Sequence, residues 1–281
     1  MQGKSVRTAV WDMAVSSQID VIALQEAASI ETSGQWVAAP NGSVTCGATP
    51  VGSTATCGVM SFVKSGPAER KTRRSEASAA AKFAYVQVNW AKPSRVEALD
   101  DAVMDLEDDN PDLEHSERKT RAKVHHAELK EKLTLAEEAG THCNMALAVR
   151  WSGAAPVVFS VSTLGGAGTS DRPALSVTVG GVTYFNVHLT SGAGGGKART
   201  TELQALKLLA ATKLQWVALG DFNQSPSHTE ADLGMDTIVH TKGATHRSGG
   251  NYDYAVAHNV AIATAQLVPS LQSDHKAVFI K

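Results

Sequence analysis

The segment Gly220-Asp221-Phe222-Asn223 places a carboxylate and a carboxamide directly after the apolar run 216–219. An apolar run bounded in this way is typical of a buried strand that ends at the edge of a sheet. Carboxylate and amide oxygens fixed at such an edge can bind a hard metal ion or orient water. Asp221 and Asn223 are therefore candidate catalytic residues.

Three further polar clusters adjoin apolar, strand-like runs elsewhere in the chain. They are Gln25-Glu26, Asn186-Val187-His188 and Ser273-Asp274-His275. Strands are rigid elements that position the residues at their ends. We therefore expect four strand ends to converge on one site that holds both carboxylates and histidines.

The composition favours a sheet-rich enzyme. At 281 residues the chain can form one large domain, or two small ones, with a substantial core. A formal net charge of −2 provides no global basic field for nucleic acid, although a local basic face is compatible with it. No apolar run approaches the ~20 residues of a membrane span, and no signal peptide is visible at Met1.

Two of the three cysteines, Cys46 and Cys57, flank a loop rich in Gly, Thr and Ser, whereas Cys143 stands apart. A bridge between Cys46 and Cys57 would staple a hairpin in a secreted protein. The alternative is three reduced cysteines that act as small apolar residues. Because the spacing shows neither a metal-ligand pattern nor a paired framework, both interpretations stay open.

Hydrophobic periodicity predicts helices over 6–17 and 198–212, and loops with a hairpin over 34–66. Many strands separated by few helices predict a core of sheet packed on sheet, flanked by helices. The predicted strands cover residues 19–24, 59–63, 83–90, 145–151, 157–161, 174–179, 182–189, 214–219, 251–257 and 276–280.

Residues 93–140 have a different composition, dense in Glu, Asp, Lys, Arg, Ala and Leu. Apolar residues at helical spacing, with a break at Asn110-Pro111, predict a helical pair inserted between two strands. One interpretation of residues 94–139 is a docking surface for a delivery subunit, an inhibitor or substrate. The other is a tolerated surface insertion.

Five motifs occur in one particular order along the chain: Ile-Ala-Leu-Gln-Glu-Ala at 22–27, Phe-Asn-Val-His-Leu at 185–189, Gly-Asp-Phe-Asn at 220–223, Asp-Tyr-Ala-Val at 253–256 and Ser-Asp-His at 273–275. In this order they resemble the endonuclease/exonuclease/phosphatase superfamily, which includes DNase I. The resemblance implies a single DNase I-like domain over residues 1–281. Its fold would be a four-layered α/β/β/α sandwich that carries the helical insertion.

Within this superfamily the chain is most similar to the catalytic B subunits of cytolethal distending toxins. The narrower likeness rests on Asp-Arg-Pro-Ala-Leu at 171–175, on the Gly-rich turn after His188, and on Thr-His-Arg-Ser-Gly at 245–249. The family's first strand ends in an asparagine near the metal, and that strand has no counterpart in the segment from Met1 to Glu26.

The resemblance implies a metal and an acid–base pair. Glu26 would bind Mg²⁺ or another divalent cation, because Mg²⁺ takes one or two carboxylates and keeps several waters. His188 would be a general acid or phosphate donor, oriented by Asp253. Asp274 and His275 would form a base dyad, and the acid and base labels of the two histidines can be exchanged.

The remaining implied roles concern water and phosphate. Asp221 and Asn223 would position both from one tight turn. Arg172, which precedes a proline, would clamp phosphate, with Arg150 as a weaker candidate for the same task. His246 lies in a family-like segment and would contact phosphate.

The implied function is Mg²⁺-dependent hydrolysis of DNA phosphodiester bonds by the catalytic part of a bacterial genotoxin-like toxin, which would be secreted and delivered into a target cell. This reaction needs an activated water, a metal that neutralises phosphate charge, and an acid for the leaving oxygen. One alternative is a phosphatase of the same fold that acts on phosphoinositides or other phosphomonoesters. Another is a catalytically degenerate member used for protein binding.

Overall fold

The computed structural model describes residues 10–11, 13–25, 35–37, 42–47, 53–62, 81–90, 143–165, 172–190, 196–234, 237–240, 243–246, 249–262, 264–267 and 278–280. Three predicted site residues, Glu26, Asp274 and His275, lie outside these ranges, as does the predicted insertion 93–140. Predictions that concern those residues stay predictions.

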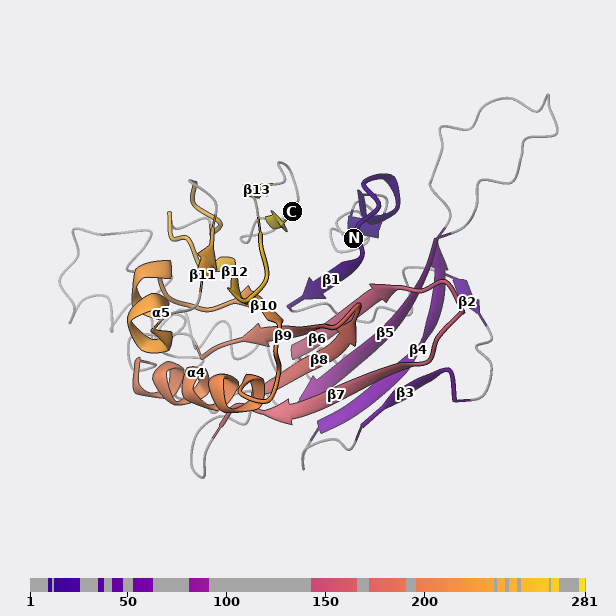
Figure 1. Ribbon diagram of the computed structural model, residues 1–281, viewed down its shortest axis with the longest axis horizontal. Coiled ribbons are helices and arrows are strands. Elements are labelled where there is room, and N and C mark those ends of the chain that lie inside the picture. Colours follow the sequence, from indigo (N-terminus) through magenta and orange to yellow (C-terminus); the bar gives the residue numbers. More distant parts are fainter. Residues whose placement is uncertain are drawn as a thin grey trace, which may run out of the picture.

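Two β-sheets form the centre of the described structure (Figure 1). The first has the strand order β1-β6-β5-β4-β2, with bounds Val21–Leu24 (β1), Cys143–Arg150 (β6), Ala81–Trp90 (β5), Ser53–Phe62 (β4) and Gln35–Val37 (β2). The second has the order β11-β12-β10-β9-β8-β7-β3. Its strands have the bounds Thr237–Val239 (β11), Asp253–His258 (β12), Trp216–Asp221 (β10), Val182–His188 (β9), Pro173–Val179 (β8), Val157–Thr163 (β7) and Val44–Cys46 (β3). A small third sheet pairs β13 (Ala265–Leu267) with β14 (Val278–Ile280).

The two large sheets pack face to face because their strands alternate in the direction of their side chains. In β6, Met145, Leu147 and Val149 enter a core that also contains Leu175 and Val177 of β8. The intervening alanines of β6 face the other side of the first sheet. The core between the sheets is therefore built from every second residue of each strand.

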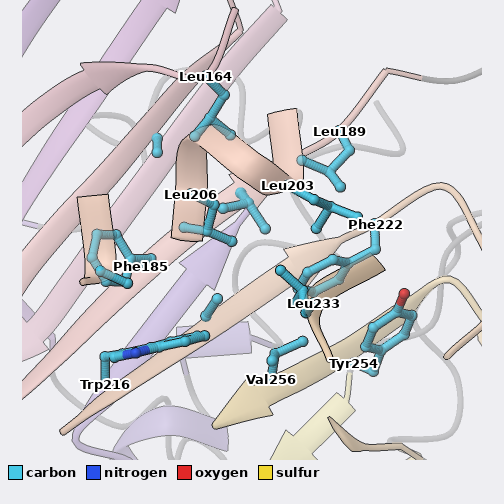
Figure 2. Packing of buried hydrophobic residues seen from close by; sticks show 14 residues of the cluster. Leu164, Phe185, Leu189, Leu203, Leu206, Trp216, Phe222, Leu233, Tyr254 and Val256 are labelled. Carbon is cyan, nitrogen blue, oxygen red and sulfur yellow. The ribbon is translucent and has the colours of Figure 1, made fainter. Parts of the chain in front are cut away.

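Helices cover the outer faces. On the second sheet, α4 (Gly196–Ala210) and α5 (Pro226–Leu233) supply Leu203, Leu206 and Leu233 to a buried cluster (Figure 2). On the first sheet, the helical residues 10–11 and 13–16 include Trp11, which stacks on Phe62 with ring centroids 4.1 Å apart. This gives the four-layered α/β/β/α sandwich that the sequence predicts.

Cys46 and Cys57 form a disulfide, but the bridge does not close a hairpin. Cys46 belongs to β3, which pairs with β7 in the second sheet, whereas Cys57 belongs to β4, which pairs with β5 in the first. The bridge therefore joins the two sheets. The hairpin expectation is wrong because β3 and β4 lie in different sheets and do not pair with each other.

The strands that flank the predicted insertion are neighbours in the first sheet. β5 and β6 are antiparallel, and their register pairs Trp90 with Cys143. The chain therefore leaves and re-enters the first sheet at two adjacent positions. Within the described part of the chain, none of the helices has the length and apolar character needed to cross a bilayer.

Candidate active site

Three of the predicted site residues form a row across one edge of the second sheet. His188 ends β9, Asp221 ends β10, and Asp253 begins β12. β9 and β10 are parallel with His188 opposite Asp221, and β12 runs antiparallel to β10 with Asp253 opposite Asp221. The alternation along a strand puts the three side chains on one face, because their neighbours Val187 and Tyr254 pack on the helix side.

The first two members of this row are paired. Nε2 of His188 lies 3.5 Å from Oδ2 of Asp221, and only 8% of His188 and 3% of Asp221 are exposed. Nε2 is thus the ring nitrogen that faces the carboxylate, and Nδ1 is buried. In a site with little water, the carboxylate attracts a protonated imidazole more strongly than it would in bulk solvent. Asp253 lies one strand further from His188 than Asp221 does.

A tight turn after β10 fixes the Asp221 carboxylate. Its Oδ1 accepts the backbone N–H of Asn223 at 2.8 Å, and its Oδ2 accepts Nδ2–H of Asn223 at 3.0 Å. Asn223 has φ +49°, a left-handed conformation that Asn tolerates better than most residues. Both oxygens of Asp221 are thus held by the residue that the sequence pairs with it.

The orientation of the Asn223 carboxamide follows from its partners. Nδ2 donates to the Leu189 carbonyl at 2.8 Å as well as to Asp221, and both partners only accept. The amide nitrogen is therefore committed. Within the described residues, Oδ1 of Asn223 receives no hydrogen bond, so this acceptor is available to a water or a cation.

Glycine is required at position 220, immediately before this turn. Gly220 has φ +145°, and a Cβ atom there would collide with the Val187 carbonyl oxygen and approach Nε2 of Gln25 to 2.9 Å. The close approach lets β10 lie against β9 and the end of β1 at the same point.

The end of β1 is tied to the same row. Nε2 of Gln25 donates to Oδ1 of the fully buried Asn186 at 2.6 Å, and Nδ2 of Asn186 donates to the carbonyls of Leu24 and Ala146. Asn186 precedes His188 by two residues and so lies on the same face of β9. These hydrogen bonds bring Gln25, the residue just before Glu26, to the edge of the sheet that holds His188.

The segment after His188 is held by Arg172, which directly precedes β8, and by Glu202 of α4. Nη1 of Arg172 donates to the carbonyls of His188 at 3.4 Å and Leu189 at 2.9 Å. The carboxylate of Glu202 accepts N–H and Oγ1–H of Thr190, at 2.8 and 2.6 Å. Arg172 is only 3% exposed, so its placement favours holding the backbone over direct contact with phosphate.

Helix α4 contributes a second side chain to this segment. Nη1 of Arg199 donates to the Thr190 carbonyl at 3.0 Å. Burial lowers the pKa of Arg199, while the nearby carboxylates of Glu202 and Asp221 act in the opposite direction. The sequence does contain a signal for these residues: Arg199 and Glu202 occupy the helical stripe that continues with Leu203, Leu206 and Ala210 toward the core.

Two other candidates lie in different places. Arg150 is on the outer side of the first sheet, where Nη2 donates to the Ala14 carbonyl at 3.0 Å and the guanidinium covers Phe83. It is not brought to the row. His246 is closer to it, because Oγ1 of the buried Thr245 accepts the backbone N–H groups of residues 252 and 253, which fixes this loop at the start of β12.

Comparisons with known proteins identify the fold. The cytolethal distending toxin of Haemophilus ducreyi superposes with a TM-score of 0.57 at 17% identity, covering 99% of this chain and 91% of that chain. CdtB, the biologically active subunit of cytolethal distending toxin, gives 0.54 at 18%, covering 99% and 92%. The toxin of Actinobacillus actinomycetemcomitans gives 0.55 at 18%, covering 99% and 91%. These likenesses show the fold.

At the sequence level, no curated protein matches this chain. The model of the Endonuclease/Exonuclease/phosphatase family, however, matches residues 3–275. This span covers nearly the whole chain, including the row and all five motifs. The chain therefore belongs to the Endonuclease/Exonuclease/phosphatase family, whose members hydrolyse phosphoester bonds.

Proposed function

We propose that the protein is a Mg²⁺-dependent endonuclease that hydrolyses DNA phosphodiester bonds. The observation that carries the proposal is the His188–Asp221 pair, 3.5 Å apart, at the shared end of β9 and β10. It combines a proton donor and a fixed carboxylate at one strand edge, and family membership supplies the reaction class.

Each residue of the row has a defined task in this reaction. A water attacks phosphorus, the bond to the leaving oxygen breaks, and that oxygen must gain a proton. His188 delivers the proton through Nε2 and is recharged from solvent, while Asp221 stabilises the charged imidazole. Oδ1 of Asn223 accepts a hydrogen bond from the attacking water. In this scheme His275, oriented by Asp274, is the base.

Asn223 is better suited to water than to phosphate. Its amide nitrogen is committed to Leu189 and Asp221, and its oxygen is an acceptor, as phosphate oxygens are. Two acceptors do not bond directly. We therefore assign Asn223 to the nucleophilic water or to water bound on the cation.

The donors near the row fit Mg²⁺. Among the described residues, no three His, Cys, Asp or Glu side chains are close enough together to form a metal cluster. Mg²⁺ needs no such cluster, because it takes one or two carboxylates and keeps its waters. The Gln25–Asn186 bond places the chain just before Glu26 at the row, so Glu26 would hold the ion. The ion would neutralise phosphate charge during bond cleavage.

The proposal extends to a secreted toxin that acts on the DNA of a target cell. The similar solved structures are cytolethal distending toxins and the biologically active CdtB subunit. The Cys46–Cys57 disulfide supports passage through an oxidising compartment, because such bonds are rare in reducing cytosol. A delivery subunit or inhibitor that docks on residues 94–139 belongs to the same proposal.

Nicking of supercoiled plasmid tests this function. We expect nicking with Mg²⁺, none with EDTA, and a loss of about 100-fold or more in His188→Ala. His228→Ala is the matched control, because His228 is exposed on α5 and bonds only locally to Ser225. Phosphate release from a phosphoinositide is measured in parallel. Release without nicking would assign the protein to the phosphatases, and a folded protein with neither activity would make it a binding member of the family.

A further inference from the structure

The backbone that follows His188 is hydrogen-bonded at every polar group from the His188 carbonyl to the Thr190 carbonyl. The His188 carbonyl accepts a hydrogen bond from Arg172. The Leu189 N–H donates to the backbone carbonyl of Asp221 at 2.9 Å, and the Leu189 carbonyl accepts from the Asn223 side chain. The Thr190 N–H donates to Glu202 of α4, and the Thr190 carbonyl accepts from Arg199 of the same helix. Helix α4 therefore reaches past the apolar core to hold a point two residues from the candidate acid.

The most informative member of this set is Glu202, which is fully buried. A buried carboxylate carries a large desolvation cost unless hydrogen bonds compensate it. Each Glu202 oxygen accepts a hydrogen bond from Thr190: Oε2 accepts the N–H and Oε1 accepts Oγ1–H. The Arg199 guanidinium also interacts electrostatically with this carboxylate. An apolar side chain at position 202 would pack on Leu203 and Leu206 without this cost, so core formation alone does not explain a glutamate there.

We propose that Glu202 and Thr190, together with Arg199, form a positioning device for His188. This inference rests on the proposed function and adds to it the residues that hold the acid in place. Neither Glu202 nor Thr190 touches the reacting atoms in this scheme. They fix the main chain at 190, and through it the direction in which the imidazole leaves β9 and meets Asp221. A small displacement of a catalytic group costs up to ~10²-fold in rate.

The chain offers a matched set of variants. Thr190→Val keeps the size of the side chain but removes the hydroxyl that Glu202 accepts, whereas Thr190→Ser keeps the hydroxyl. Thr201→Val is the control, because Thr201 is exposed on the same helix and bonds only to the Lys197 carbonyl. Glu202→Gln retains one acceptor for Thr190 N–H and can donate to Oγ1, whereas Glu202→Ala retains neither.

The first readout is the imidazole of His188 in long-range ¹H–¹⁵N NMR spectra, assigned by the signals that vanish in His188→Ala. We expect these signals to move in Thr190→Val and Glu202→Ala, recorded where both are fully folded, and to stay in place in Thr190→Ser and Thr201→Val. Unchanged His188 signals in folded Thr190→Val would overturn the proposal and reduce Glu202 to an anchor for α4. If Glu202→Ala does not fold, the Thr190 pair decides alone.

The second readout is plasmid nicking. We expect kcat of Thr190→Val to fall about 10-fold or more with little change in KM, because positioning acts on the transition state and not on DNA binding. Thr190→Ser should recover most of the rate. A wild-type protein that nicks no DNA, but whose His188 signals move in Thr190→Val, would remove the proposed function and leave the positioning device in place.

Discussion

Nε2 of His188 and Oδ2 of Asp221 lie 3.5 Å apart because these residues are register partners at the ends of two parallel strands. Parallel strands deliver their carboxyl ends to the same edge of a sheet, so two residues 33 positions apart meet there, with α4 in the connection between their strands. Asp221 is further locked by Asn223, which returns two hydrogen bonds to the same carboxylate.

We expect Asp221→Asn to lower plasmid nicking by about 100-fold, because the variant removes the negative charge that faces His188. The amide oxygen of the variant can still accept the backbone N–H of Asn223. Its new NH₂ group, however, faces the side-chain NH₂ group of Asn223, so two donors oppose each other. A loss of about 1–2 kcal/mol in the free energy of unfolding should follow. Nicking rates and urea denaturation check both values, with the exposed Asp20→Asn as control. Full activity in the folded variant would show that the charge of Asp221 is dispensable.

The sequence predicts best the strands that are buried on both faces of a sheet, because burial determines the side-chain type at each position. In β5, Phe83 and Tyr85 face the N-terminal helix while Ala84, Val86 and Val88 face the other sheet. Such alternation over 83–90 predicts a strand with little ambiguity. The ends of β9 and β10 are visible for the same reason, because a polar residue stops each apolar run.

The elements that the sequence misses are held by contacts with distant residues. Helix α5 buries only Thr229 and Leu233, so it has almost no apolar stripe. What holds it is tertiary: Oγ1 of Thr229 hydrogen-bonds to the Tyr254 hydroxyl at 2.6 Å. The three-residue strands β2, β11 and β13 are too short to show a period. The helical stripe of α4 indicates that Glu202 faces inward, but its partner Thr190 lies in the segment after β9, so the pattern of α4 alone does not reveal the contact.

Gly220→Ala should destabilise the protein by about 2 kcal/mol or more, because the added methyl meets the Val187 carbonyl at a backbone φ of +145°. The collision also pushes β10 away from β9, so nicking should fall with stability. Gly196→Ala is the matched control, since nothing lies within 4 Å of a Cβ built there. Thermal unfolding of both variants is the measurement. Equal midpoints for the two would show that the strands separate easily at this point.

Loss of the Cys46–Cys57 disulfide should lower the free energy of unfolding by about 3 kcal/mol. The bridge closes a loop with a sequence separation of 11, and loop closure of that size predicts this value. Urea denaturation with and without reductant measures it in the wild type and in the Cys46→Ala/Cys57→Ala variant. Reductant should lower the free energy of unfolding of the wild type and leave that of the variant unchanged. A reductant effect that persists in the variant would assign it to Cys143.

The stability of the fold should fall at alkaline pH through Tyr254. Burial raises the pKa of its hydroxyl above the ordinary value of 10.0. Above pH 10 the unfolded chain therefore releases a proton that the folded protein retains, and stability drops by about 1.4 kcal/mol per pH unit. Below pH 10 this contribution is fully present.

Tyr254→Phe isolates that contribution. The variant loses the hydrogen bonds to Thr229 and to the Gln224 carbonyl, so it should be less stable by about 1–2 kcal/mol at neutral pH. Between pH 10 and 11 its stability should fall less steeply than that of the wild type. Urea denaturation at pH 8, 9.5, 10.5 and 11 measures both slopes, and other tyrosines cancel in the comparison. Parallel slopes would contradict the assignment to Tyr254.

Deletion of residues 94–139 should leave the sandwich intact. β5 and β6 are antiparallel neighbours, with Trp90 opposite Cys143, so a short Gly/Ser linker can join them as an ordinary hairpin connection. The apolar residues of the segment, spaced for one helix–helix seam, are too few to be part of a shared core. They are Val96, Leu99, Val103, Leu106, Val124, Leu129 and Leu133.

Nicking by the deletion variant should therefore persist, because His188 and Asp221 lie on the second sheet and Asn223 in the turn that follows β10, while the cut is made in the first sheet. Any delivery or inhibition that depends on a partner should disappear, if the segment is the docking surface. Urea denaturation and plasmid nicking of the variant, beside the wild type, separate these effects. A variant that is insoluble or unfolds without cooperativity would place the segment in the core. A soluble, active variant that still responds to the partner would assign the segment to a tolerated insertion, because docking would then have to lie elsewhere on the sandwich.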